Sequence, residues 1–69
     1  MEHRNVISSN LQSVGYDALS STLEVRFHSG GTYQFFNVPE SVWRALMGAP
    51  SHGEYFAAHI KDRYRKVRL

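Results

Sequence analysis

Histidines are the side chains of this 69-residue chain best suited to metal binding or to acid–base chemistry. His52 and His59 would lie two turns apart on one predicted helix, whereas His3 and His28 fall in other segments. The chain contains no His-Glu-x-x-His or His-x-His motif and no carboxylate at metal-ligand spacing. We therefore interpret the histidines as scattered surface residues and expect no metal ion.

Nucleophiles, carboxylates and glycines also lack a catalytic arrangement. The chain has no cysteine, which excludes disulfides, thiolate metal sites and cysteine nucleophiles. No serine stands in a Gly-x-Ser-x-Gly turn, the six acidic residues are dispersed, and the glycines form no Gly-x-Gly-x-x-Gly or Walker pattern. We therefore predict that the protein is not an enzyme and uses no cofactor.

Positive charge is concentrated at the end of the chain. Residues 1–58 hold three basic and five acidic residues, whereas residues 59–69 hold five basic residues and one acidic residue. A basic end is often only the solvated face of a helix, but it can also bind phosphate groups. The candidate nucleic-acid-binding residues are Lys61, Arg63, Arg65, Lys66 and Arg68, with Arg26 and Arg44 as additional candidates.

The first half of the chain predicts three antiparallel strands, at about residues 13–17, 23–28 and 32–36. In the second of them, apolar and polar residues alternate strictly, the pattern of a sheet that is covered on one face only. Gly15, inside the first strand, indicates a bulge or a close backbone approach. Leu19, in the link that follows this strand, is expected to fold back onto the core.

A turn at Ser29-Gly30-Gly31 sets the register of the last two strands. A two-residue loop would place a polar residue of one strand opposite an apolar residue of the other. A three-residue loop pairs Phe27 with Tyr33 and Val25 with Phe35, and it supplies glycine where a left-handed residue is needed. We therefore predict the three-residue loop.

Aromatic residues make up 13% of the chain, and some of them must reach the surface of so small a domain. Phe36 is the best candidate, because it faces away from Tyr33 and Phe35 on the predicted strand. It could stack an unpaired base, or it could cover a sheet edge or a helix end.

The second half of the chain predicts two helices. The first starts near Pro39, ends at Gly48 and carries an apolar stripe formed by Val42, Trp43, Leu46 and Met47. The second begins with a capping box in which Ser51 is the N-cap residue and Glu54 its partner. Apolar residues at helical spacing extend this helix into the basic segment, and they are Phe56, Ile60, Tyr64 and Val67.

Length and pattern together predict a single α+β domain over residues 1–69. A three-stranded antiparallel β-meander is followed by two helices packed on one face, in the order β-β-β-α-α. The core is expected over about residues 6–64, and the basic C-terminal end of the second helix covers residues 61–69. No apolar run is long enough to cross a membrane and no signal-peptide core follows the N-terminus, so we expect a cytoplasmic protein without membrane contact.

Several short motifs follow one another along the chain with matching gaps. They include Val14-Gly15-Tyr16-Asp17, Leu23-x-Val25-x-Phe27, Tyr33-x-Phe35, Val38-Pro39-x-x-Val42, Ser51-x-Gly53-x-Tyr55-Phe56, Ile60 and Tyr64. Over about residues 6–64 this set resembles the KTSC domain family, which is named for the C-terminus of some lysyl-tRNA synthetases and also occurs as stand-alone bacterial proteins. The family hallmark is a central Tyr-x-Tyr, which here reads Tyr33-Gln34-Phe35 and lacks the second hydroxyl.

The resemblance implies RNA binding, which is suggested for the family because of its attachment to a synthetase. We therefore expect a small non-enzymatic module that binds RNA or single-stranded nucleic acid weakly through its basic C-terminal helix. The alternative is a protein–protein interaction module that uses an exposed sheet edge or an aromatic patch.

Overall fold

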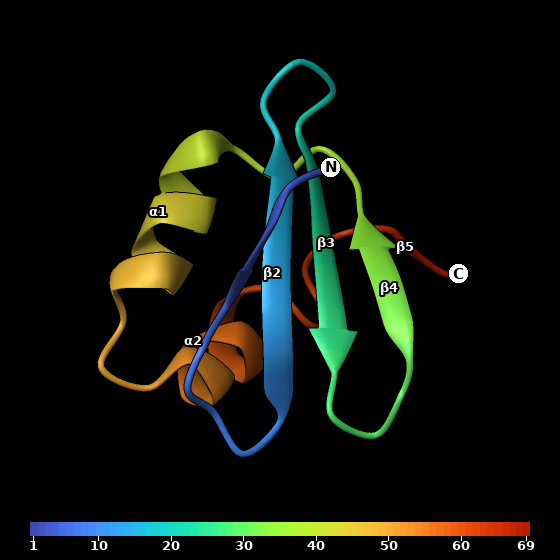
Figure 1. Ribbon diagram of the computed structural model, residues 1–69. Coiled ribbons are helices and arrows are strands. Elements are labelled where there is room, and N and C mark those ends of the chain that lie inside the picture. Colours follow the sequence, from blue (N-terminus) through green and yellow to red (C-terminus); the bar gives the residue numbers. More distant parts are fainter.

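The computed structural model describes residues 1–69 and contains a five-stranded antiparallel sheet with two helices packed on one of its faces (Figure 1). The strands are β1 (His3–Asn5), β2 (Leu11–Asp17), β3 (Thr22–Phe27), β4 (Thr32–Phe35) and β5 (Lys66–Arg68), and they lie side by side in that order. The helices are α1 (Glu40–Gly48) and α2 (His52–His59). Neither helix has the length and hydropathy needed to span a bilayer.

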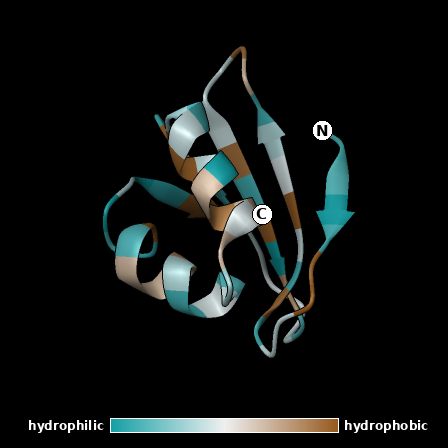
Figure 2. Cartoon of the chain, turned by 90° about the vertical axis from the view of Figure 1, so that its left-hand side faces the viewer, coloured by the Kyte–Doolittle hydropathy of each residue, from teal (hydrophilic) through white to brown (hydrophobic).

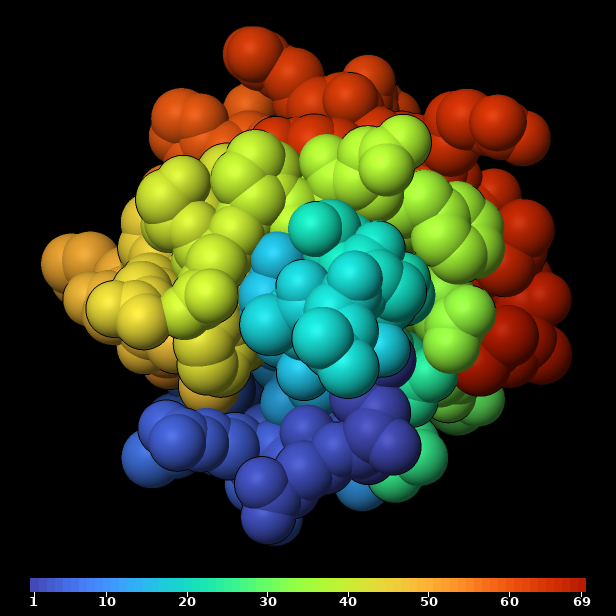
Figure 3. Space-filling model, turned by 90° about the horizontal axis from the view of Figure 1, so that it is seen from above, coloured from blue at the N-terminus to red at the C-terminus, as the bar shows by residue number.

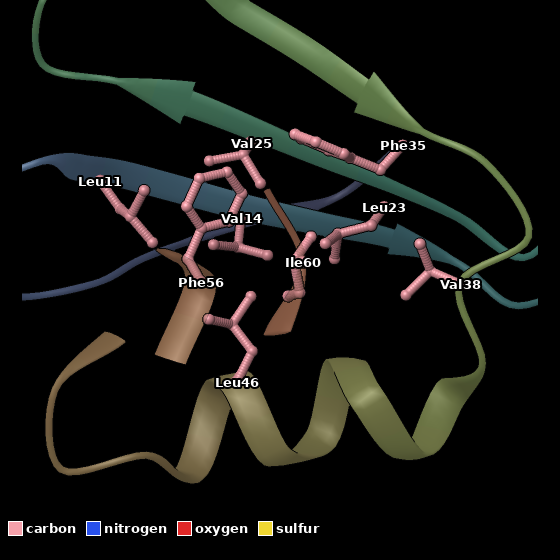
Figure 4. Close-up of a cluster of buried hydrophobic side chains, with 9 residues drawn as sticks. All are labelled: Leu11, Val14, Leu23, Val25, Phe35, Val38, Leu46, Phe56 and Ile60. Carbon is pink, nitrogen blue, oxygen red and sulfur yellow. The ribbon is translucent and has the colours of Figure 1, made fainter. Parts of the chain in front are cut away.

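The hydrophobic core lies between the sheet and the helices, as Figure 4 shows. Its nine buried residues are Leu11, Val14, Leu23, Val25, Phe35, Val38, Leu46, Phe56 and Ile60. The strand residues among them follow the predicted alternation, so one face of the sheet carries the core and the other, here called the outer face, carries polar side chains. The predicted α+β fold with two helices on one face is therefore confirmed.

Both predicted helix starts are confirmed by the capping geometry. Pro39 is the N-cap residue of α1, and Gly48 is its last residue. At the start of α2, Oγ of Ser51 accepts a hydrogen bond from the backbone N–H of Glu54 at 3.3 Å, as the capping box predicts. The Ser51 cap satisfies a backbone N–H that α2 would otherwise leave unpaired, whereas Pro39 makes no side-chain cap.

An aromatic stack joins α1 to the sheet. The rings of Tyr16 in β2 and Trp43 in α1 lie nearly parallel, with their centroids 5.2 Å apart. The Tyr16 hydroxyl also donates a hydrogen bond to the backbone oxygen of Val38 at 2.6 Å. The apolar stripe of α1 is thus held against the sheet through Tyr16 of β2 as well as through the buried Leu46.

The prediction of a three-stranded sheet is wrong, because one extra strand lies at each edge. β1 pairs with β2, and all three of its residues are hydrophilic, as Figure 2 shows. β5 pairs with β4 in the segment that was predicted to be the basic end of the second helix, residues 61–69. The basic C-terminal helix is therefore also wrong, since α2 ends at His59 and a turn precedes β5.

Edge pairing explains why α2 stops. In a continued helix the repulsion between Lys61 and Arg65 would be offset by the attraction between Asp62 and Lys66, both at i,i+4 spacing. The strand instead satisfies the edge of β4, because Phe36 N–H donates to the oxygen of Arg65 at 2.9 Å and Leu69 N–H to that of Thr32 at 2.8 Å. Unpaired backbone groups of β4 thus gain partners that a helix would not provide.

The register of the β3–β4 hairpin differs from the prediction by two residues. Val25 lies opposite Tyr33, and Leu23 lies opposite Phe35. The loop still has three residues, but it starts one position earlier, with Phe27 N–H donating to the oxygen of Gly31 at 2.9 Å. A shift of two residues leaves every side chain on its predicted face.

Two local predictions on β2 and the turn after it have opposite outcomes. The close backbone approach at Gly15 is confirmed, because a Cβ atom there would lie 2.8 Å from Cδ2 of His3. The irregularity of β2 lies elsewhere, between Leu11 and Ser13. Leu19 does not fold back onto the core but is fully exposed, since its N–H is held by the Asp17 carboxylate at the tip of the turn.

Candidate functional site

A groove of about 420 Å³ opens between the β3–β4 hairpin, α2 and the C-terminal segment, and we call it the hairpin groove. Its floor consists of four aromatic rings, those of Phe27, Tyr33, Phe35 and Phe56. Its rim carries polar and basic side chains, among them Ser9, Asn10, His28, Ser29, Lys61 and Lys66. No acidic residue lines it, so the hairpin groove combines an apolar floor with a positively charged rim.

The aromatic floor is fixed by edge-to-face contacts. Phe56 of α2 contacts both Phe27 and Phe35, with centroids 5.5 and 5.4 Å apart, and Tyr33 stands at 81° to Phe27. Such perpendicular pairs stabilise their mutual orientation. Phe35 and Phe56 are buried, whereas Phe27 and Tyr33 are half-buried and remain accessible from the groove.

The strand β5 determines where two of the basic residues lie. Lys66 is opposite Phe35 and Arg68 is opposite Tyr33 in the β4–β5 ladder, so both belong to the helix-covered face of the sheet. The guanidinium of Arg68 lies 5.8 Å from the ring centroid of Tyr33, within cation–π range. Lys61, just after α2, completes a cationic cluster, which we define as Lys61, Lys66 and Arg68.

The structure does not bring the other predicted cations into this cluster. Arg26 belongs to the outer face, because it alternates with the core residue Val25, and Arg65 is exposed just before β5 begins. Arg63 is exposed in the turn after α2. Arg44, on the outside of α1, donates from Nε to the carboxylate of Glu40 at 2.9 Å. The C-terminal segment, orange to red in Figure 3, lies along the top and the right-hand side of that view.

The hallmark residues and Phe36 have distinct positions. Phe35 is in the core, 1% exposed, so a phenylalanine at this position acts as a packing residue. Tyr33 lines the groove, and its ring lies within cation–π range of Arg68. Phe36 is half-buried beyond the end of β4, where its backbone pairs with Arg65.

A polar network on the outer face was not predicted from the sequence. His3 contacts Ser13 Oγ through Nδ1 at 2.8 Å and Glu24 Oε2 through Nε2 at 2.6 Å, and Gln34 Nε2 donates to Glu24 Oε1 at 2.9 Å. The network crosses β1, β2, β3 and β4. The only sequence signal for it was Gly15, whose missing side chain leaves room for His3.

This network links a serine, a histidine and a carboxylate, but Ser13 is only 2% exposed. Its hydroxyl therefore cannot reach a substrate in this conformation. Burial raises the pKa of Glu24, but hydrogen bonds from Gln34 and His3 and the charges of His3 and the N-terminus outweigh it, so the net pKa is lowered. The network thus binds the Glu24 carboxylate between His3 of β1 and Gln34 of β4.

The family model for the KTSC domain matches residues 7–64 of the chain. The chain belongs to the KTSC domain family. A crystal structure of a KTSC domain protein from Yersinia pestis is 35% identical in sequence and superposes with a TM-score of 0.96, covering 99% of this chain and 96% of that one. The resemblance predicted from the motifs is thereby confirmed.

Two kinds of relatives share this KTSC domain. A protein from Stutzerimonas stutzeri is 43% identical over 63 residues, which cover 90% of this chain and 89% of that protein. A lysine–tRNA ligase from Trichormus variabilis is 36% identical over 61 residues, which cover 88% of this chain but only 11% of the ligase. The domain therefore occurs both in proteins of its own length and within a much longer enzyme.

Proposed function

We propose that this KTSC domain is a non-enzymatic module that binds single-stranded nucleic acid, most simply RNA, through its cationic cluster. The observation that supports the proposal is the position of Lys61, Lys66 and Arg68 beside a groove with no acidic lining residue. The two ion pairs of the structure, His3–Glu24 and Arg44–Glu40, involve none of these cations. Their charges are therefore available to a polyanion.

The relatives also support this ligand. One of them is named lysine–tRNA ligase, an enzyme that acts on tRNA, and a segment of it is similar to the present chain. A module that supplies RNA contacts would suit such an enzyme as well as a stand-alone protein. A cytoplasmic location, expected from the sequence, is part of the proposal.

The size of the cationic cluster sets the expected strength of binding. Three cations that each neutralise one phosphate of a single strand give a slope of about −2 when log K is plotted against log salt concentration. Phosphate contacts of this kind carry no sequence information. We therefore expect a Kd of about 10⁻⁴–10⁻⁶ M at physiological salt, in the range of non-specific binding.

Fluorescence anisotropy with a short labelled single-stranded RNA tests the proposal. The triple variant Lys61→Gln, Lys66→Gln, Arg68→Gln should lose about tenfold in affinity at low salt and show a flatter salt dependence. The matched control is Arg44→Gln, which removes a cation of α1 that is paired with Glu40. Wild-type protein that fails to bind at high micromolar concentration and low salt would rule the proposal out.

The exposed edge of β5 favours a second candidate, a protein–protein interface. Val67 is 46% exposed and Leu69 is 65% exposed, and one side of this strand has no partner strand. Such edges can pair with another chain. Sedimentation over a range of protein concentrations would reveal self-association, and a partner would change the NMR shifts of β5 in the absence of RNA.

A further inference from the structure

We infer that the hairpin groove is a binding site for one unstacked nucleobase together with the phosphate next to it. The inference rests on the proposed function, and it assigns the aromatic floor of the groove a role of its own beside that of the cations on its rim. The cationic cluster supplies charge, whereas the hairpin groove would hold the base.

The floor of the groove offers rings on which a base can stack. Phe27 and Tyr33 are half-buried and line the groove, and they stand at 81° to one another. Phe35 and Phe56 pack beneath them in the core, so the floor is already formed without a ligand. Stacking on aromatic side chains tolerates any base, because every base has a π face.

The rim offers hydrogen-bonding groups that have no partner within the chain. The side chains of Ser9, Asn10 and Ser29 make no hydrogen bond to another residue, and Asn10 is hydrogen-bonded through its backbone alone. The Asn10 amide is both a donor and an acceptor, which matches the edge of an unpaired base. By contrast, His28 is already engaged, with Nε2 3.0 Å from the backbone oxygen of Ser8.

Charge and size restrict the ligand further. Lys61 and Lys66 line the same groove and would contact a phosphate attached to the bound base. A volume of about 420 Å³ falls in the range of small-ligand sites, roughly 300–1,000 Å³, and is too small for a stacked duplex. An aromatic floor, free amide and hydroxyl groups and a cationic rim together suit a nucleotide whose base has left the stack.

Three RNA ligands of equal length separate the role of the groove from that of the cations. These are a single strand with normal bases, the same backbone without bases, and a duplex. We expect the single strand to bind at least about fivefold more tightly than the abasic strand, because one stacked base contributes that much or more. The duplex tests the contribution of charge alone, since its bases are stacked and paired and cannot enter the groove.

Two variants locate the effect. Asn10→Ala, at an exposed residue, and Tyr33→Leu, at a half-buried one, should reduce the preference for the strand with bases. Equal affinity for the two single strands, or a preference that persists in both variants, would overturn the inference while the proposed function stands. Failure of every RNA to bind would overturn both.

Discussion

Nε2 of His3 lies 2.6 Å from Oε2 of Glu24, so a side chain of β1 reaches across β2 to a side chain of β3. Gly15 is the residue of β2 that pairs with both of them, and its missing side chain leaves the space for the imidazole. The apolar core contributes little to β1, whose residues are at least partly exposed. This polar contact therefore adds to the backbone pairing with β2 that holds the first strand onto the sheet.

Glu24 should make the domain sensitive to acid. Its pKa lies below the ordinary value of 4.5, so its stabilisation is complete above that value and is lost as the pH falls through the folded-state pKa. Glu24→Gln should lower the free energy of unfolding at pH 7 by about 1–3 kcal/mol. Urea unfolding at successively lower pH should show this difference shrinking below about pH 4.5. A difference that stays constant down to about pH 3 would contradict the expectation.

Gly15→Ala should displace β1. The added methyl group would lie 2.8 Å from Cδ2 of His3 and 3.0 Å from the backbone oxygen of Glu2, so the strand must move. We expect a loss of about 1–3 kcal/mol in unfolding free energy and faster hydrogen exchange in β1. Gly48→Ala is the matched control, because nothing lies within 4 Å of the new Cβ atom and alanine favours the helix. Unchanged exchange rates in β1 would disprove the steric explanation.

Two leucines provide a direct test of where the core lies. Leu46 is fully buried and Leu19 fully exposed, so the same substitution has different consequences. Leu46→Ala should cost about 2–5 kcal/mol through lost burial and an unfilled cavity. Leu19→Ala should stay within about 0.5 kcal/mol of wild type. Chemical denaturation measures both values, and similar losses in the two variants would be inconsistent with this core.

Val67→Pro should weaken both β5 and the cationic cluster. Val67 lies opposite Gln34, and proline cannot donate a backbone hydrogen bond to the sheet. We expect a loss of about 1 kcal/mol in stability and a reduced affinity for RNA, because β5 positions Lys66 and Arg68. Val67→Thr keeps the backbone N–H and serves as the control. RNA affinity that is unaffected by the proline would show that the strand does not position these cations.

The elements predicted correctly from the sequence have strong local signals. Alternation identifies β3 and β4, and the capping residues Pro39 and Ser51 identify the starts of the two helices. β1 has no such signal, since His3, Arg4 and Asn5 are all polar and the strand depends on its contacts with β2. The pairing of β1 depends on contacts with residues distant in the sequence, so no local sequence pattern predicts it.

The candidate site could be predicted only as a list of charges. The excess of basic residues after position 58 indicates the right segment, but the spacing of Ile60 and Tyr64 favours a helix there. Pairing with β4 overrides that preference, and it places Lys66 and Arg68 beside Tyr33 and Phe35. The meeting of cations and aromatic rings in one groove depends on this long-range pairing.

The row of polar contacts on the outer face has a further consequence for the β3–β4 hairpin. A shift of the two strands by two residues would keep the hydrophobic side chains on the same face of the sheet, so the alternation alone does not choose between these alignments. In the slid arrangement Glu24 would face Phe36 instead of Gln34 and would lose the amide that it now accepts from. Polar side chains of the outer face therefore distinguish between strand alignments that the hydrophobic residues leave equivalent.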